Sequence, residues 1–464
     1  MRTTISSKGG SALQNFLSII YNHLPIYFQN LYISVENKKV KEERYGDTYA
    51  ALMRELMSKT NVERGEEARW NEFRRLLEHS IGQSPFYRKI YQGIELKAIQ
   101  GIGDLPKLPL LDREAIQQHI HQMHAVEGAA AAVAHEIDRE GVPLKFLLTK
   151  EDIQKRNAFM DFYKQQNGGA SRAMKQAIFT SRKIVPKAQQ KKAYWRDNRP
   201  ENIRLYSNYH CTQENAELYI RNLNEFQPAF ITGTSPILYK LAIFLNETKE
   251  KLAFSPQAIF LQGGLMEPAQ QIEIEKAFTC PVRTYFVPSY EFPIMSECST
   301  GKFHIHPRAG IIELAEDGEM IVTNFMSYGT PIIRCKTGVY AELNNGAANC
   351  TCGSSQPIIE CRKESDSSCL TIADNIKVQL PQLDETDIAF SESVKKMQFV
   401  QHKKEEIEVF VEAGETYTNE LSKTIHQNLQ SAFSQDMKFN IRVVEEMPKN
   451  MDEDFQLIIN KLAN

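Results

Sequence analysis

Three cysteines and a histidine in the second half of the chain have the spacing of a metal site. Cys298 and His304 form one closely spaced pair, and Cys350 and Cys352 form another. Structural zinc takes four such ligands in a tetrahedron, commonly supplied as two short-spaced pairs. Buried cysteines that pack as small apolar residues, beside a surface histidine, are the alternative interpretation. We expect the four residues to bind zinc, with His306 as the competing imidazole.

A pair of glycines follows a short apolar strand. Gly263, Gly264 and Leu265 come directly after the segment AIFLQ. Open α/β sheets bind ligands beyond the carboxyl ends of their strands, so these residues are candidates for a ligand contact. Because glycine pairs also follow strands where no ligand binds, the motif alone is a weak signal.

Strand-like and helix-like segments alternate through the middle of the chain. Residues 145–149 are predicted to be a strand and 151–167 a helix, and residues 177–186 are strand-like. Three further strand–loop–helix units begin near residues 203, 228 and 256. Such alternation implies βαβ units and a mostly parallel sheet. The predicted fold class is therefore α/β, with helices beginning after the N-cap residue Asp112 and near Thr212.

Length, charge and cysteine use limit the class of protein. With 464 residues, the chain is too long for one ordinary hydrophobic core, so two or three domains are expected. The formal net charge of −3 gives no basic excess for a nucleic-acid partner. The eight cysteines come without a signal peptide, which favours a cytoplasmic protein with reduced thiols. The apolar stretch 16–28 is too short to be a transmembrane helix.

Several motifs occur in a fixed order in the second half of the chain. After Glu291 come E-C-x-x-G-x-x-H from Glu297 to His304, two short strands around the turn 316–318, and then P-I-I-R, K-T-G and C-T-C-G. This order resembles the adenylate-forming superfamily and specifically its phenylacetate–CoA ligase-like branch. Within that branch it is most similar to the CapK-type and coenzyme-F synthetase-type proteins. The resemblance extends from about Leu24 to the C-terminus.

The resemblance implies a two-domain architecture and a reaction. It implies a large N-terminal domain at 1–360 with mostly parallel sheets, and a small mobile α+β lid at 361–464. Within the first domain, residues 13–125 would be a helical segment and residues 298–352 the zinc-like subsite. The polar run CRKESDSSC lies where the family places its hinge. The family's reaction joins a carboxylate to ATP as an acyl-adenylate, then transfers the acyl group to a thiol, such as coenzyme A or carrier-protein pantetheine.

The resemblance also assigns roles to single residues. Glu291 matches the acid that helps hold the magnesium–nucleotide complex, and His210, in the segment SNYHC, matches a residue near the carboxylate substrate. The residues that it places around the nucleotide are Gly263, Gly264, Leu265, Arg334, Lys336 and Gly338. A glutamate at a loop end and a lone histidine are often structural, so Glu291 and His210 are candidates for catalysis.

Three positions depart from the family pattern. The phosphate loop T-S-G-[ST]-T-G-x-P-L-K aligns with residues 136–145, where three carboxylates replace the hydroxyls and the inner glycine. Each carboxylate within about 4 Å of a phosphate would cost roughly 1–4 kcal/mol. Val339 occupies the position of the aspartate that binds the ribose hydroxyls. Glu453 and Asp454 occupy that of the catalytic lysine, although Lys449 and Lys461 lie nearby.

The three departures make the use of magnesium–ATP doubtful. We expect a divergent member that binds an acyl or aryl carboxylate, or its thioester, with impaired or absent adenylation. An active ligase with a rebuilt nucleotide site is one alternative. An ATP-independent acyltransferase, with His210 as the base, is another. Whether the chain is an enzyme stays open, and a protein partner or a homodimer is compatible with the sequence.

Overall fold

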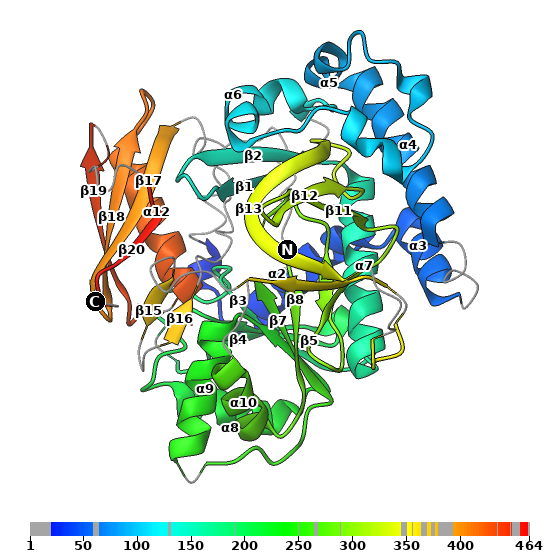
Figure 1. The fold of residues 1–464 in the computed structure, drawn as a ribbon. Coiled ribbons are helices and arrows are strands. Elements are labelled where there is room, and N and C mark those ends of the chain that lie inside the picture. Colours follow the sequence, from blue (N-terminus) through cyan, green and yellow to red (C-terminus); the bar gives the residue numbers. More distant parts are fainter. Residues whose placement is uncertain are drawn as a thin grey trace.

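The computed structural model describes residues 20–58, 65–128, 131–189, 191–248, 250–263, 268–287, 289–344, 350–354, 356–362, 369–372, 376–378, 393–433, 435–445, 447 and 455–462. In Figure 1, blue and cyan helices lie above and beside a large green and yellow sheet, and a small orange and red sheet lies to the left. The α/β fold class predicted from the sequence is confirmed.

A twelve-stranded sheet forms the centre of the protein. Its strand order is β11-β12-β13-β14-β10-β9-β8-β7-β6-β3-β5-β4. Only the run from β8 to β5 is parallel. These parallel strands are β3 (Gln176–Thr180), β5 (Ile203–Ser207), β6 (Phe230–Gly233), β7 (Ala258–Gly263) and β8 (Val282–Phe286). The parallel part coincides with the stretch in which strands and helices alternate, because parallel strands need a crossover helix between them.

The rest of the large sheet is antiparallel, so the sheet is mixed and is not mostly parallel as predicted from the sequence. Its strands are β4 (Trp195–Asn198), β9 (Met295–Glu297), β10 (Phe303–Ile305), β11 (Gly310–Leu314), β12 (Glu319–Asn324), β13 (Ile332–Asn344) and β14 (Ile358–Cys361). The long strand β13 pairs first with β12 and then, through its last residues, with β14. Strand β13 therefore joins the β11–β12 pair to β14 and the strands beyond it.

Helices cover both faces of the parallel strands. Along β7, Phe260 belongs to the same apolar core as Phe159 of α7 (Lys150–Gly168). Its neighbour Ile259 belongs to a second core on the other face, with Ile220 and Leu238. This alternation is the period of two expected for a strand that is buried on both sides. The helices of the second core are α8 (Ala216–Phe226), α9 (Ser235–Glu247) and α10 (Pro268–Phe278).

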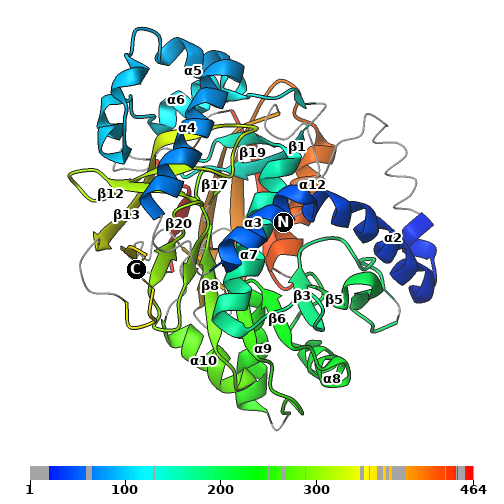
Figure 2. The ribbon, with the colours of Figure 1, turned by 90° about the vertical axis from the view of Figure 1, so that its right-hand side faces the viewer.

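The N-terminal helices are α2 (Ile26–Arg44), α3 (Asp47–Met57), α4 (Gly65–Gln83), α5 (Pro85–Ile90) and α6 (Arg113–Met123). In the side view of Figure 2, α2 lies at the edge of the molecule. The predicted N-cap of α6 is confirmed, because the Asp112 carboxylate accepts the backbone N–H of Ala115 at 2.8 Å. A short antiparallel hairpin, β1 (Ala132–Ile137) and β2 (Pro143–Leu148), connects α6 to α7.

The C-terminal region forms a second, smaller sheet in the order β19-β18-β17-β20. Its elements are β17 (Val394–Lys403), β18 (Glu406–Ala413), α12 (Asn419–Phe433), β19 (Lys438–Val444) and β20 (Ile458–Asn460), beside a hairpin of β15 (Leu370–Ile372) and β16 (Ile376–Val378). Leu429 of α12 belongs to a separate apolar core together with Phe399 and Val409. A salt bridge of 2.8 Å from Lys240 to Asp436 links this region to α9. Of the predicted hinge at 361–369, residues 363–368 lie outside the described residues, so the boundary at 360 stays a prediction.

Two local predictions need correction. Strand β3 ends at Thr180, so the strand-like pattern at 181–186 is not a strand. The chain turns there because the Thr180 hydroxyl accepts the backbone N–H of Arg182 at 3.2 Å. Helix α8 begins at Ala216, and Thr212 caps only the turn before it, by accepting the N–H of Asn215. No helix in the described part of the chain is long and apolar enough to cross a membrane.

Candidate active site and metal centre

The four predicted metal ligands meet in space, and the ligand atoms that they offer lie within 4.8 Å of one another. The Sγ atoms of Cys298 and Cys350 are 3.9 Å apart, and Cys352 Sγ is 3.6 Å from His304 Nε2. Tetrahedral zinc has bonds of about 2.3 Å to sulfur and about 2.0 Å to nitrogen, which gives edges of about 3.8 Å between sulfurs and about 3.6 Å between sulfur and nitrogen. The cluster could therefore hold a metal ion.

A backbone carbonyl beside His304 orients its imidazole ring for metal binding. Its Nδ1 lies 3.1 Å from the carbonyl oxygen of Pro357. A proton on Nδ1 would be donated to that carbonyl and would leave the Nε2 lone pair facing the cysteines, as is usual for metal-binding histidine. Hydrogen bonds, first from the Thr300 hydroxyl and then from the backbone N–H of Cys352, lower the pKa of Cys350 to about 6.

His306 lies outside this cluster. Its ring lies 5.7 Å from that of Phe159, and its Nδ1 accepts the backbone N–H of Arg308 at 3.2 Å. Burial lowers the pKa of His306 to about 4. Of the two imidazoles considered from the sequence, the structure therefore brings His304 to the cysteines.

Glu291, the candidate for the magnesium–nucleotide complex, is engaged by an arginine. It follows the carboxyl end of β8 and is fully buried. Arg113, at the start of α6, approaches its carboxylate at 2.6 Å and donates a second hydrogen bond to the Thr337 carbonyl at 3.1 Å. Burial raises the pKa of Glu291, although the Arg113 charge opposes this shift. The buried carboxylate therefore has a cation beside it.

The hairpin turn that aligns with the phosphate loop is stabilised by one of its own carboxylates. One Asp138 oxygen accepts the backbone N–H groups of Glu140 and Val142, each at 2.9 Å. The other accepts the side-chain amide of Gln117 on α6 at 2.7 Å. Phosphate loops bind their ligand through such backbone N–H groups. In this turn, the Asp138 carboxylate accepts two of them.

Glu136, at the end of β1, is the second acid of this turn region. Its carboxylate accepts the backbone N–H of Tyr290 at 2.8 Å and is buried. Burial, followed by the nearby Glu291 carboxylate, raises the pKa of Glu136 to about 8. The Glu136 carboxyl group is therefore mostly protonated, and so uncharged, near neutral pH.

The small C-terminal sheet touches the same turn. The backbone N–H of Met397 on β17 donates to the Gly141 carbonyl at 2.8 Å. Gly141 has φ of +79°, and a Cβ there would overlap the Met397 carbonyl oxygen and lie 2.9 Å from the Phe455 ring. Glycine is therefore required both by the backbone angle and by the close approach of the second sheet.

Arg334, a predicted nucleotide contact, makes its hydrogen bonds within the protein and stabilises the antiparallel part of the sheet. It is 5% exposed and has φ of +51°, which is unusual for a residue with a Cβ. Its guanidinium makes two hydrogen bonds of 3.0 Å to Glu313 and one to the Leu108 carbonyl. These contacts join β13 to β11 and to the segment before α6.

Lys336 and Gly338, also on β13, share one partner. Lys336 Nζ lies 3.1 Å from a Glu319 oxygen, and the Gly338 N–H donates to the other at 2.8 Å. The Gly338 carbonyl accepts a hydrogen bond from Arg139 of the hairpin turn at 3.1 Å. Val339 packs into the core, so its side chain offers no polar atom at the position expected for the ribose acceptor.

His210 lies just beyond the carboxyl end of β5. Its Nδ1 is 3.0 Å from the Ser207 hydroxyl, and its ring stacks on Tyr194 with centroids 4.7 Å apart. Burial lowers the pKa of His210, which favours the neutral imidazole that a general base requires. Gly263 ends β7 at the same edge of the sheet. Gly264, Leu265, Lys449, Glu453 and Asp454 lie outside the described residues.

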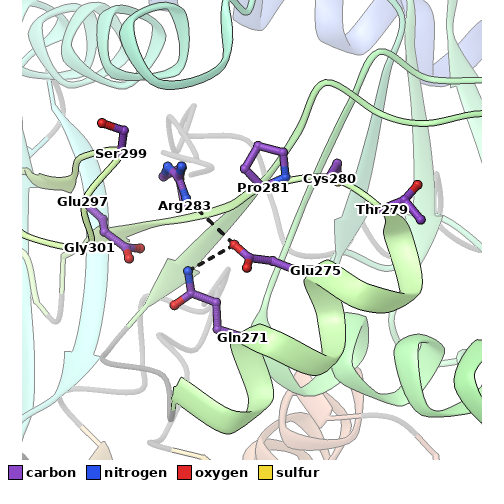
Figure 3. Close-up of a pocket in the computed structure, with 9 residues that line it drawn as sticks. All are labelled: Gln271, Glu275, Thr279, Cys280, Pro281, Arg283, Glu297, Ser299 and Gly301. Atoms are coloured by element: carbon purple, nitrogen blue, oxygen red, sulfur yellow. Dashed lines mark hydrogen bonds and ion pairs between the residues drawn. The ribbon is translucent and has the colours of Figure 1, made fainter. Parts of the chain in front are cut away.

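A polar hollow of about 540 Å³ opens at the opposite end of β8 (Figure 3). Glu275 lies between Gln271 and Arg283 in this hollow, 3.4 Å from the amide nitrogen and 3.9 Å from the guanidinium nitrogen. Ser299 and Gly301 line its other side, next to Cys298, one of the predicted metal ligands. The hollow lies at the amino end of the strand, away from Glu291 and from the edge where parallel sheets bind ligands.

Two residues of this site, Arg113 and Gln117, were not predicted from the sequence. Both lie on α6, and Asp112 beside them was assigned only as an N-cap. A spacing of four places both side chains on one face of the helix. Two polar residues on one face of a helix with buried Ile116 and Ile120 were the available signal.

Comparisons with known proteins agree with this description. Residues 370–461 match the family model of the CapK C-terminal domain. The chain is 27% identical over 463 residues to Protein CapK of Staphylococcus aureus, and the match covers 96% of this chain and 100% of that protein. This similarity spans both the large sheet and the small one.

Solved structures of a 2-hydroxyisobutyryl-CoA ligase share the fold. The open conformation in complex with 2-HIB-AMP and CoA is 14% identical, with a TM-score of 0.52, and the match covers 85% of this chain and 91% of that one. The postadenylation state in complex with R3-HIB-AMP is also 14% identical, with a TM-score of 0.54 and coverage of 90% and 94%. At this identity, the likeness concerns the fold.

Proposed function

We propose that this chain, a member of the CapK-type branch of the adenylate-forming superfamily, binds an acyl or aryl carboxylate, or its thioester, without the ATP-dependent adenylation of that superfamily. The ligand would lie at the carboxyl edge of the parallel strands, near His210 and Gly263. The thiol partner would be coenzyme A or the pantetheine of a carrier protein. These ligand classes are suggested by the ligase likeness of the fold.

The observation that supports this proposal most directly is the Asp138 carboxylate in the hairpin turn. It accepts the N–H groups of Glu140 and Val142, which a triphosphate would otherwise need. A phosphate at this place would have to displace a buried carboxylate and would meet its charge. At about 4 Å, that repulsion is worth roughly 1–4 kcal/mol for each pair of charges.

Two further contacts support the same proposal. Arg113 pairs with Glu291, the acid that would otherwise face the magnesium ion. Met397 of the small sheet hydrogen-bonds to Gly141 of the turn, where the outer phosphates would enter. Binding of magnesium–ATP would therefore require one ion pair to open and one sheet to move, in addition to the displacement of Asp138.

We also propose that the Cys298, His304, Cys350 and Cys352 cluster binds one structural zinc ion. Three thiolates and one imidazole favour zinc over magnesium or calcium, which prefer oxygen ligands. The ion would tie the turn before β14 to β9 and β10. Its role would be stability, because four protein ligands leave no open position for a substrate.

Titration calorimetry with magnesium–ATP tests the proposed loss of adenylation. Wild-type protein should show no binding at millimolar nucleotide and no pyrophosphate exchange with a panel of carboxylates. Asp138→Ala frees two backbone N–H groups and should give measurable ATP binding. Glu140→Ala is the matched control, because the only described group that donates to the Glu140 carboxylate is the Gln117 amide. Micromolar binding by the wild type would overturn the proposal and favour an active ligase with a rebuilt nucleotide site.

A second measurement separates binding from ATP-independent acyl transfer. Acyl-CoA substrates are incubated with candidate acceptors in the absence of nucleotide, and the release of free thiol is followed. Turnover that is lost in His210→Gln would favour the acyltransferase. If no thiol is released while acyl thioesters bind, a binding protein is favoured.

A further inference from the structure

Helix α2 exposes a row of large apolar side chains, called here the apolar stripe. Its members are Tyr27, Phe28, Leu31, Tyr32 and Val35, which are between 38% and 64% exposed. Tyr27, Leu31 and Val35 are four residues apart, as are Phe28 and Tyr32, so the five form two adjacent rows on one side of the helix. Single exposed apolar residues are normal, but a contiguous patch of them usually marks a contact surface.

The other side of α2 is held to the protein largely through polar groups. Gln29 is 2% exposed and accepts a hydrogen bond from the Arg196 guanidinium at 2.6 Å. The Asn30 side chain accepts the backbone N–H of Asp197 at 3.1 Å, and the Ser34 hydroxyl donates to the Asp197 carbonyl at 3.3 Å. Surface helices usually turn their apolar side inward. Here polar side chains face inward and the apolar stripe faces outward, which indicates a partner outside the chain.

The position of α2 makes the apolar stripe accessible. Figure 2 shows this helix at the edge of the molecule. Other exposed apolar side chains in the described part of the chain lie on separate elements, such as Met57 on α3, Ile272 on α10 and Val443 on β19. The apolar stripe therefore differs from the scattered exposure found elsewhere on this surface.

Two exposed lysines lie in the loop that contacts α2. Lys191 and Lys192 directly precede Ala193, whose carbonyl accepts a hydrogen bond from Arg196 at 2.9 Å. Arg196 in turn donates to Gln29 of α2. The loop between β3 and β4 that contains these lysines has no aspartate or glutamate, and α2 itself has four basic residues and three acidic ones. Water satisfies the two lysines, and because they are exposed they can attract an anionic surface.

We propose that the apolar stripe, together with Lys191 and Lys192, binds the surface of an anionic lipid bilayer. Apolar and aromatic side chains on one side of a helix enter the boundary between headgroups and acyl chains, while nearby cations meet anionic headgroups. Tyrosine suits this depth because its ring combines an apolar body with a polar tip. The proposal is independent of the proposed function. Because the lysine loop begins at the carboxyl end of β3, the contact would place this edge of the sheet beside the bilayer.

The apolar stripe is small for an interface between two copies of the chain. Five large side chains that are about half exposed offer roughly 500 Å² of surface. One partner of a stable protein interface covers about 800 Å². Shallow insertion into a bilayer has no such minimum area, because binding strength scales with the apolar area buried and with the attraction to anionic lipids. The size of the stripe and the lysines beside it therefore favour a lipid surface.

Cosedimentation of the full chain with vesicles tests the proposal. One set of vesicles contains phosphatidylcholine alone, and the other contains equal parts of phosphatidylcholine and phosphatidylglycerol. The protein should bind the anionic vesicles at least about tenfold more tightly than the neutral ones, and added salt should reduce this difference. Equal binding to both sets, or binding to neither, would overturn the proposal.

A double variant tests the apolar stripe. Phe28→Ser with Leu31→Ser should weaken binding to the anionic vesicles about tenfold or more, because two inserted side chains are lost. Ile272→Ser is the matched control, since Ile272 is 61% exposed on another helix, α10. All of these side chains are exposed, so the melting temperature should stay that of the wild type. Equal loss in the control, or none in the double variant, would contradict the proposal.

A second double variant tests the charges. Lys191→Gln with Lys192→Gln should weaken binding to the anionic vesicles about tenfold or more and leave binding to the neutral ones unchanged. Lys403→Gln with Lys404→Gln is the control, as an adjacent exposed pair in the turn between β17 and β18. If both pairs behave alike, the lysines beside the stripe do not select anionic lipid and the proposal fails. Light scattering without lipid that shows a dimer, dissociated by the Phe28 and Leu31 changes, would assign the stripe to a second copy instead.

Discussion

Arg113 holds the fully buried carboxylate of Glu291 at 2.6 Å, across 178 positions of sequence. The acid follows strand β8 and the arginine begins helix α6, so the pair fixes the first turn of that helix against the sheet. From the sequence, Glu291 was a candidate for the magnesium–nucleotide complex. In the structure, its charge is compensated by the protein itself.

The first prediction concerns this pair. Arg113→Met should lower the free energy of unfolding by about 3–5 kcal/mol at pH 8, because it leaves a buried carboxylate without its cation. Adding Glu291→Gln should restore most of the loss. Arg74→Met is the control, because Arg74 pairs with Glu78 on the exposed face of α4, and should cost no more than about 1 kcal/mol. Urea unfolding measures all four proteins, and equal losses for Arg113→Met and Arg74→Met would contradict the prediction.

The second prediction concerns pH. The pKa of Glu136 is about 8 in the folded protein, against 4.5 for an ordinary glutamate, chiefly because it is buried. The folded chain therefore binds this proton more tightly than the unfolded chain. As a consequence, the contribution of Glu136 to stability falls as pH rises from about 4.5 to about 8.

Glu136→Gln removes this titration and keeps an oxygen to accept the Tyr290 N–H. The variant should gain stability over the wild type between pH 5 and pH 8, by on the order of 2–4 kcal/mol. Denaturant unfolding across this range provides the measurement. Glu247→Gln, at the exposed end of α9, should follow the wild-type curve. A Glu136→Gln curve parallel to the wild type would show that Glu136 is charged when folded.

Local signals in the sequence predicted much of the fold. The helix predicted at 151–167 is α7, which runs from Lys150 to Gly168, and Asp112 was identified as an N-cap. Periodicity and capping depend on neighbouring residues, so they can be read without the fold. The two ligand pairs of the metal cluster were likewise identified from short spacings, and the chemistry of four ligands was enough to join them.

The partners of the acidic residues could not be predicted in this way. The carboxylates at 136–140 were expected to face a triphosphate and to repel it. Asp138 instead turns back onto the N–H groups of its own hairpin, and Glu136 accepts that of Tyr290. An aspartate in a turn has both options, and only the position of Gln117 and of the small sheet selects one. In the antiparallel half of the large sheet, only the strand pair around the turn 316–318 was predicted, since the other pairings are set by tertiary contacts.

The third prediction concerns the metal centre. Purified protein should contain about one zinc ion per chain, and Cys352→Ser should lower both the zinc content and the melting temperature. Chelation of the wild type should produce the same destabilisation, because the ion joins the turn before β14 to β9 and β10. Cys369→Ser is the control, as this cysteine lies outside the cluster. Metal-free protein with unchanged stability would argue against a structural zinc ion.

The fourth prediction tests the contact between the two sheets at Gly141. Gly141→Ala places a Cβ where the Met397 carbonyl and the Phe455 ring lie, and it also strains a backbone with φ of +79°. Gly93→Ala is a matched control, because Gly93 has φ of +86° and no atom within 4 Å of its added Cβ. Both variants carry the backbone cost, which is on the order of 1 kcal/mol. Only Gly141→Ala also pushes the small sheet away from the hairpin turn.

Limited proteolysis can measure this difference as the rate of cleavage at the predicted hinge, residues 361–369. Exposed polar segments between domains are preferred cleavage sites, and their cleavage rate rises when the domains separate. Gly141→Ala should therefore be cut there several times faster than Gly93→Ala and should release a large fragment ending near residue 360. If the two variants are cut at the same rate, the Gly141–Met397 contact does not hold the small sheet in place. In that case, the turn would be accessible to a nucleotide without any movement of the C-terminal region.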